Sequence, residues 1–296
     1  MPDLIQIENV RRRYRRTVAL DGVSLSIPGG GVIGLVGENG AGKTTLIKHV
    51  LGLLRAQEGT VRVFGLDPTR HPEEVLGRIG YLSENRDMPG WMRVSELMRY
   101  TKGFYPRWDA RYAEELRELF QLDPTAKLKT LSLGQTAKAG LLCALAHRPE
   151  LLVLDEPSGG LDPIVRRDIL AAVFRTVADE GRTVLFSSHL LDEVELASDR
   201  VVMVHTGRIV LDSPKKDVMG KHARVVVRAA TQPPMFDGVL LWEQKDSQWQ
   251  AVCYGEPDAL RAAAAQAGLN GVEFSPPSLD EIFIAHSAAQ ARAKAV

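Results

Sequence analysis

The residues best suited to chemistry form one glycine-rich loop in the first fifth of the chain. In order they are Gly37, Glu38, Asn39, Gly40, Ala41, Gly42, Lys43 and Thr44, with Thr45 next. They fill every fixed position of the phosphate-binding loop pattern. The glycines let backbone N–H groups point inward around the β- and γ-phosphates of a nucleotide. We expect Lys43 to reach the terminal phosphates and the Thr44 hydroxyl to bind Mg²⁺. A glycine-rich turn that binds nothing is the alternative, and the complete pattern argues against it.

A second chemical signal is the acidic pair Asp155-Glu156, which follows the apolar run 151–154. Ligands of parallel α/β folds bind at the carboxyl ends of the strands, which is where these carboxylates are expected. Asp155 would hold Mg²⁺ directly or through water, and Glu156 would polarise the water that attacks the γ-phosphate. The alternative is a pair of charges at a helix N-terminus before Pro157.

The elements that must position these residues alternate between strand and helix. The run Val32–Val36 is almost wholly apolar, as is typical of a strand covered on both faces of a parallel sheet. Helices are predicted from Lys43 to about Leu53 and from Asp162-Pro163 to about Asp179, and a further strand covers Thr183–Ser187. This alternation predicts an α/β fold, a P-loop NTPase core with a parallel sheet.

Three further regions are expected around that core. Alternating apolar residues at 4–7 and 23–27 predict an antiparallel N-terminal β-subdomain. A helical subdomain is predicted over about 88–150. Within it, Asp109 is a candidate N-cap, and a helix is expected over about Ala137–Ala146.

The domain prediction places a nucleotide-binding domain at 1–218, because lysine, glycine and proline cluster between 213 and 222. A small C-terminal α+β domain follows at 222–290. Its strands are predicted at 224–227, 239–242 and 250–253, and its alanine-rich helix at 258–267. The end of the chain after Ile284 is expected to fray, with 291–296 as the tail.

Composition limits the class of protein. Lysine plus arginine and aspartate plus glutamate both number 37, so the formal net charge of +0 gives no reason to expect a nucleic-acid partner. Cys143 and Cys253 form no metal-like spacing or disulfide framework, which suits a reducing cytoplasm. No signal peptide or apolar run long enough to span a bilayer is recognisable, so a membrane role would act through a partner.

A third motif, Leu131-Ser132-Leu133-Gly134-Gln135, precedes a predicted helix and the acidic pair. Together with Gly160-Leu161-Asp162 and His189, it completes an ordered set of five motifs. Over about residues 4–215 the chain resembles the nucleotide-binding domain of ABC transporters. That family carries a phosphate loop, a signature close to LSGGQ, an Asp-Glu pair, a Gly-Leu-Asp turn and a switch histidine.

The resemblance implies roles in a shared site. Two ATP molecules, each with Mg²⁺, would lie between two such subunits. In that arrangement Ser132, Gly134 and Gln135 would contact the γ-phosphate held by the other subunit, and Asp162 would lie at the dimer seam. It also implies that His189 touches the γ-phosphate and that Tyr14 stacks on adenine. By itself His189 reads as a surface histidine, and the arginines on either side of Tyr14 as a solvated turn.

Two positions depart from the family pattern. Glu84 follows the strand 79–82 where a glutamine that contacts Mg²⁺ and water is usual. Glutamate keeps an oxygen for the metal, but its charge would repel the γ-phosphate, so it would act through water or bind the metal more strongly. Leu133 stands where glycine is common, which requires a backbone φ below zero there. We interpret both as differences of a subfamily.

The partner is expected to be a polytopic membrane subunit, with a second ABC ATPase subunit completing a homodimer or a heterodimer. Met88 and Trp91 could line a groove in which the membrane subunit docks, or they could pack within the helical subdomain. For Phe104 and Trp108, packing within the helical subdomain is favoured. The ending 275–283 and the segment 104–109 resemble bacterial ATPase subunits of exporters of the ABC-2 type. This places the subunit at the cytoplasmic face of the membrane. The alternative is an ABC ATPase that acts on a soluble macromolecular complex.

Overall fold

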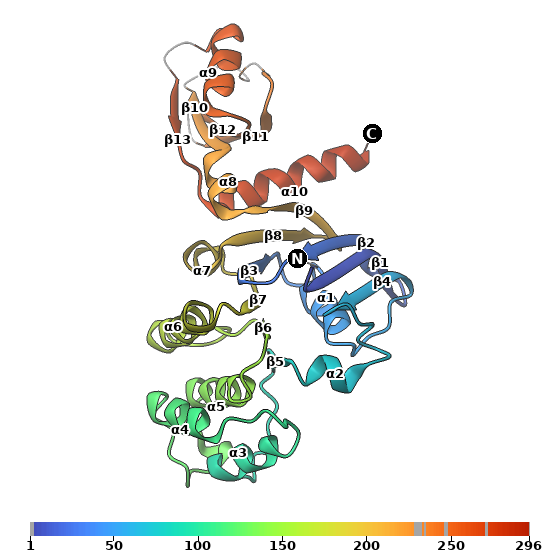
Figure 1. Cartoon of the computed structure of the whole chain (residues 1–296). Coiled ribbons are helices and arrows are strands. Elements are labelled where there is room, and N and C mark those ends of the chain that lie inside the picture. Colours follow the sequence, from blue (N-terminus) through green and yellow to red (C-terminus); the bar gives the residue numbers. More distant parts are fainter. Residues whose placement is uncertain (1–2, 228–232, 234, 246–247, 270–271, 296) are drawn as a thin grey trace.

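The computed structural model describes residues 3–227, 233, 235–245, 248–269 and 272–295. Figure 1 shows the helical region at one end of the molecule and a small C-terminal sheet at the other, with the main sheet between them. The fold predicted from the sequence, a P-loop NTPase core with added β, helical and C-terminal parts, is confirmed.

The main sheet has six strands in the order β5-β6-β7-β3-β8-β9, all parallel except β9. A three-stranded antiparallel sheet has the order β2-β1-β4, and a four-stranded C-terminal sheet has the order β11-β12-β10-β13. The strands are β1 (Ile5–Tyr14), β2 (Thr17–Ile27), β3 (Gly31–Val36), β4 (Glu58–Val63), β5 (Ile79–Leu82), β6 (Leu151–Asp155), β7 (Thr183–Ser188), β8 (Arg200–His205), β9 (Arg208–Pro214), β10 (His222–Val227), β11 (Val239–Lys245), β12 (Gln248–Tyr254) and β13 (Glu273–Ser275).

The helices lie on both faces of the main sheet and around its ends. They are α1 (Lys43–Val50), α2 (Pro72–Leu76), α3 (Val94–Lys102), α4 (Ala110–Leu119), the 3₁₀ turn η1 (Leu128–Thr130), α5 (Leu133–Leu145), α6 (Pro163–Glu180), α7 (Leu191–Ala197), α8 (Lys215–Gly220), α9 (Pro257–Gln266) and α10 (Leu279–Ala295). Among the described residues no helix is both long enough and apolar enough to cross a membrane.

The central strands are buried because both of their faces are covered. Along β6, Leu151 and Val153 face a core that also contains α1 and the three-stranded sheet. Leu152 and Leu154 face a second core, which contains α5 and α7. This alternation explains why the sequence reads as a continuous apolar run, since no strand position faces solvent.

Capping side chains decide where two of the helices begin. Asp109 accepts a hydrogen bond from the Tyr112 N–H at 2.9 Å, so the predicted N-cap of α4 is confirmed. Helix α5 starts at Leu133, four residues earlier than the sequence predicted, because Ser132 caps it and accepts a hydrogen bond from the Gln135 N–H at 3.2 Å. The signature motif is therefore the first turn of a helix rather than a loop.

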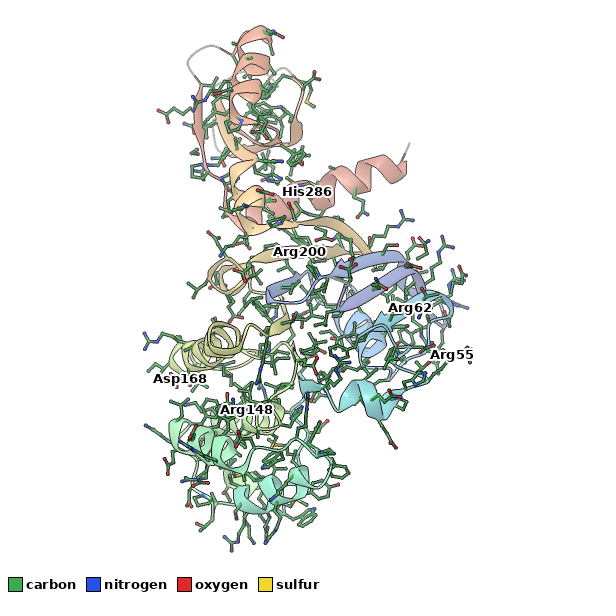
Figure 2. The ribbon with its side chains drawn as sticks, in the orientation of Figure 1. Arg55, Arg62, Arg148, Asp168, Arg200 and His286 are labelled. Atoms are coloured by element: carbon green, nitrogen blue, oxygen red, sulfur yellow. The ribbon has the colours of Figure 1, made fainter. Side chains whose placement is uncertain are left out.

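An ion pair joins two neighbouring helices, one of which carries the Asp168 labelled in Figure 2. Lys138 of α5 pairs with Asp168 of α6 at 2.8 Å. On the C-terminal side, α10 contacts α7, β9 and β11, so it packs against the main part of the chain as well as the small sheet. Residues 285–295, where the sequence predicted a fraying end, continue α10 as a helix. Alanine, glutamine, arginine and lysine are strong helix formers, which accounts for this difference.

Replacing a glycine of β5 with alanine tests how closely α5 approaches the sheet. A Cβ atom at Gly80 of β5 would lie far inside van der Waals contact with the Ala144 carbonyl oxygen and 2.9 Å from Pro149 Cγ. We expect Gly80→Ala to lower the free energy of unfolding by about 2 kcal/mol, the cost typical of overpacking, measured by urea denaturation. The matched control is Gly220→Ala, whose Cβ would meet nothing within 4 Å. An equal loss in both variants would contradict this account of the packing.

Candidate functional site

Residues 37–42 of the phosphate loop lie between the end of β3 and the start of α1, and Lys43 and Thr44 begin α1, as the sequence predicted. Two of the glycines are needed here for steric reasons. A Cβ at Gly37 would collide with the Val204 carbonyl oxygen. Gly42 has φ +114°, and a Cβ there would lie 2.5 Å from the Ala19 carbonyl oxygen. A side chain at either position would displace the loop, so the bare backbone N–H groups at the helix N-terminus stay available to an anion.

A cavity of about 240 Å³ opens over this loop. Its walls come from four separate parts of the chain: strand β2, the phosphate loop with the start of α1, and the segments that follow β5 and β6. The residues that line it are Ala19, Glu38, Asn39, Gly40, Gly42, Lys43, Thr44, Thr45, Glu84 and Glu156.

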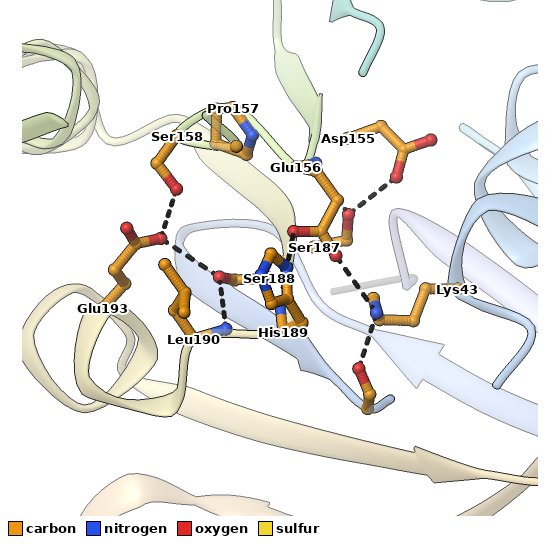
Figure 3. A network of polar contacts seen from close by, with 12 residues as sticks. Lys43, Asp155, Glu156, Pro157, Ser158, Ser187, Ser188, His189, Leu190 and Glu193 are labelled. Carbon is orange, nitrogen blue, oxygen red and sulfur yellow. Dashed lines mark hydrogen bonds and ion pairs between the residues drawn. The ribbon is translucent and has the colours of Figure 1, made fainter. Parts of the chain in front are cut away.

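The centre of the site is the carboxylate of Glu156, which two basic groups hold from opposite sides (Figure 3). Lys43 Nζ lies 3.1 Å from Glu156 Oε1, and His189 Nδ1 lies 2.7 Å from Glu156 Oε2. Lys43 also donates to the Gly37 carbonyl oxygen at 2.6 Å. Lys43 and Glu156 are only 5% and 6% exposed, so solvent screens this pair weakly. The structure thus joins residues 43, 156 and 189, which the sequence had singled out separately.

The backbone of Glu156 is held in an uncommon conformation. Its φ is +48°, in the left-handed region that a non-glycine residue seldom adopts. The Glu156 N–H donates to Ser187 Oγ at 2.9 Å, which anchors the turn to the neighbouring strand β7. Strain of this kind costs on the order of 1–3 kcal/mol and persists where the surroundings over-determine it, as they do here.

Hard oxygen donors gather beside the loop in a set that fits Mg²⁺. The Thr44 hydroxyl lies 3.2 Å from Asp155 Oδ1, and the Ser187 hydroxyl donates to the same oxygen at 2.7 Å. Burial, Asp155 and Glu84 together raise the pKa of the Tyr81 hydroxyl to about 12, a sign of the negative charge concentrated here. The described residues contain no cluster of three or more His, Cys, Asp or Glu able to hold a metal unaided. Mg²⁺ commonly binds one or two carboxylates together with the phosphates of its nucleotide, which suits this donor set.

Comparisons with known proteins identify the family of this chain. The family model described as "ABC transporter" matches residues 20–159. The daunorubicin/doxorubicin resistance ATP-binding protein DrrA of Streptomyces peucetius is 34% identical over 76% of this chain and 69% of its own length. The chain belongs to the family of ABC transporter ATP-binding proteins.

Two further relatives define how far the likeness extends. A solved structure of the ATP-binding subunit of an ABC transporter covers 96% of this ABC protein and 99% of its own chain, with a TM-score of 0.71 at 24% identity. The methionine import ATP-binding protein MetN of Rhizobium johnstonii is 36% identical over 70% of this chain and 60% of its own length. The shared cassette therefore occurs in proteins named for import and for drug resistance alike.

The signature of this ABC protein lies away from its own phosphate-loop cavity. Ser132, Gln135 and Asp162 line none of its walls, and Ser132 and Gln135 are exposed at the start of α5. Asp162 caps α6, where its carboxylate accepts from the Ile164 and Val165 N–H groups. These residues therefore contribute nothing to the wall of the cavity that Lys43 lines.

The structure explains in different ways why glycine occupies position 134 and why leucine is accommodated at position 133. A Cβ at Gly134 would lie 2.9 Å from a Val165 methyl carbon, so glycine permits the close approach of α5 to α6. Leu133 starts α5, is absent from the described residues with positive φ, and is 52% exposed. Its backbone φ is therefore not positive, which is the condition under which leucine was expected to be acceptable here.

Tyr14, the expected adenine contact, is 41% exposed at the end of β1. The Arg12 guanidinium lies 4.9 Å from its ring centroid, and Tyr14 does not line the cavity.

Sequence reasoning missed three residues around the site. Ala19 lines the cavity from β2. Ser187 hydrogen-bonds to both Asp155 and Glu156. Its position at the end of a predicted strand was the one sequence feature that could have indicated this contact. Glu193 is 3% exposed and accepts hydrogen bonds from Ser158 at 2.5 Å and Ser188 at 3.1 Å (Figure 3). Such contacts depend on neighbouring strands and leave no spacing signal in the chain.

The role expected of Glu156 has a direct test. We expect Glu156→Gln to cut the rate of ATP hydrolysis by roughly 10²–10⁴, because an amide cannot accept a proton from the attacking water. ATP affinity should stay near that of the wild type, since the phosphate loop is unchanged. Phosphate release and equilibrium nucleotide binding would be measured side by side. Near-normal turnover in the variant would remove Glu156 as the general base.

Proposed function

We propose that this chain is the Mg²⁺-dependent ATPase subunit of an ABC exporter, which powers a separate polytopic membrane subunit by ATP-driven closure of a dimer. The observation that carries the proposal is the buried Glu156 carboxylate, held between Lys43 and His189 at the edge of the phosphate-loop cavity. A carboxylate so placed can accept a proton from a water beside the γ-phosphate. When bound, Mg²⁺ would be held by Thr44 and Asp155 and would neutralise phosphate charge, with Glu84 at the cavity wall.

Dimer closure is supported by the signature residues, which do not line the phosphate-loop cavity of their own subunit. Ser132, Gly134, Gln135 and Asp162 lie outside the cavity that Lys43 and Glu156 line. Next to them in the sequence, the large aliphatic side chains of Leu133 and Ile164 are 52% and 65% exposed. A second subunit would cover these side chains and bring its own signature to this chain's phosphate loop. Each ATP would then bridge two surfaces that bind weakly without it.

Docking of a membrane subunit is supported by apolar side chains in the segment 88–104. Trp91 and Phe104 are 71% and 64% exposed, whereas Met88 and Trp108 pack against the core. For Phe104 the packing interpretation favoured from the sequence is wrong, and for Trp108 it is confirmed. Exposed aromatic groups of this kind mark protein–protein contact sites, and the segment begins just after Glu84 of the cavity wall.

Export, rather than import, is supported by two likenesses. DrrA is named for drug resistance, and the ending 275–283 resembles ATPase subunits that pair with exporter-type membrane proteins. The alternative, an ABC ATPase that acts on a soluble complex, lacks a comparable observation. Cargo choice would belong to the membrane subunit.

The shared-site arrangement makes an asymmetric prediction. In mixed dimers that pair a wild-type subunit with a Ser132→Ala subunit, the site at the wild-type subunit's phosphate loop should be damaged. Lys43→Ala in one subunit would instead damage that subunit's own site, and this variant is the matched control. Nucleotide crosslinking to each subunit would measure both. A Ser132→Ala loss confined to its own phosphate loop would contradict the shared site.

The membrane partner itself is tested by copurification. We expect the chain, extracted in mild detergent from its native host, to bring with it a polytopic membrane protein. Trp91→Ala should weaken that association, because it removes an exposed aromatic contact, and Tyr254→Ala, an exposed aromatic on the C-terminal sheet, is the control. Recovery of ribosomes or a soluble scaffold instead would favour the alternative function.

A further inference from the structure

One buried arginine outside the five motifs contacts the loop that carries Glu156. Arg86 follows β5 by four residues and is 7% exposed. One of its terminal nitrogens, Nη2, lies 2.9 Å from the Pro157 carbonyl oxygen, 3.0 Å from that of Gly159, and 3.4 Å from that of Glu156. Three carbonyl dipoles of a single turn thus converge on one cationic group.

We propose that Arg86 is a positioning residue for ATP hydrolysis, which holds the turn Glu156–Gly159, and with it the Glu156 carboxylate, through these charged hydrogen bonds. The proposal deepens the proposed function and rests on it, because it presumes that Glu156 activates the attacking water.

The first argument is the backbone strain at both ends of the contact. Arg86 has φ +51° and Glu156 has φ +48°, so two non-glycine residues in the left-handed region face each other across this interaction. Each such residue costs on the order of 1–3 kcal/mol and persists where its surroundings hold it. Charge-assisted hydrogen bonds, about twice as strong as neutral ones, supply that restraint.

The second argument is that a purely structural role would be served better by an uncharged side chain. Taking a guanidinium out of water is costly, and Arg86 is only 7% exposed. Its Nε is also buried without a hydrogen-bond partner. An apolar packing residue would avoid both the desolvation cost and the unpaired Nε. A cationic donor that holds three carbonyl groups in place must bear these costs.

The third argument is that the same turn is held from its other side. Ser158 donates to Glu193 Oε2 at 2.5 Å, and Glu193 also accepts from Ser188, the neighbour of His189 (Figure 3). Glu193 pairs in addition with Arg166 Nε at 3.0 Å. The turn is therefore fixed between a buried cation and a buried carboxylate, and both lie on segments that carry other residues of the site. Releasing one side would let Glu156 move relative to Lys43.

The position of Arg86 along the chain gives this contact a further consequence. Glu84 of the cavity wall precedes it by two residues, and the exposed Trp91 follows it by five. A displacement of the segment 88–92 by a bound partner would be transmitted to the Glu156 turn through Arg86.

The test compares Arg86→Lys and Arg86→Gln with the wild type in Mg²⁺-ATP hydrolysis. We expect kcat to fall by about 10–100-fold, because small misplacements of a reacting group cost this much, while KM for ATP changes by less than about threefold. The matched control is Arg117→Lys. Arg117 is likewise poorly exposed and donates to a backbone carbonyl, that of Leu122, but it lies in the helical region. It should keep kcat within about twofold.

Chemical rescue separates positioning from folding. In Arg86→Ala, free guanidinium at concentrations that leave the protein folded should restore part of kcat, whereas Glu156→Gln should not respond. Thermal unfolding of each variant is followed in parallel. The proposal is overturned if Arg86→Gln keeps wild-type kcat, or if kcat, ATP affinity and unfolding temperature fall together with no response to guanidinium. A wild-type protein that hydrolyses no ATP would overturn the proposed function and this role with it.

Discussion

The ion pair between Lys43 and Glu156 is the interaction on which the rest of the site depends. Both groups are almost wholly buried, so an imperfect partner for either would leave a costly uncompensated charge. Lys43 is fixed by the glycine-rich loop through Gly37, and Glu156 is fixed by His189 and the strained turn that follows β6. Each neighbouring contact therefore serves to keep one charge opposite the other. The same pair sets the distance between the phosphate loop and the proposed general base.

The parallel sheet makes this pairing possible. Strands β3, β5, β6 and β7 run in one direction, so the segments that follow them all emerge at one edge. The register places Asp155 beside Ser187, which explains why one hydroxyl can serve both members of the acidic pair. Two cores, one on each face, hold the strands in that register. Polar residues are admitted only at the edge, where hydrogen bonds and ion pairs compensate their burial.

The signature residues of the helical region take no part in the cavity of their own subunit. The signature caps α5 and packs through Gly134 against α6, so its orientation is set by helix packing rather than by the phosphate loop. That rigid placement suits a surface presented to another subunit, as we propose. The turn Glu156–Gly159 lies between this surface and the cavity, held by Arg86 and Glu193.

The sequence by itself determined the elements and the chemistry-bearing positions. Continuous apolar runs marked the buried strands, the glycine spacing marked the phosphate loop, and Asp109 and Asp162 marked two helix starts, because these signals depend on near neighbours in the chain. Tertiary structure alone decided the opposing contacts of Glu156, the bridge at Ser187 and the burial of Arg86 and Glu193. It also placed α5 earlier than predicted and left Tyr14 outside the cavity wall. Such outcomes depend on which strands become neighbours and how closely helices approach, and residues far apart in the chain carry no local pattern that records this.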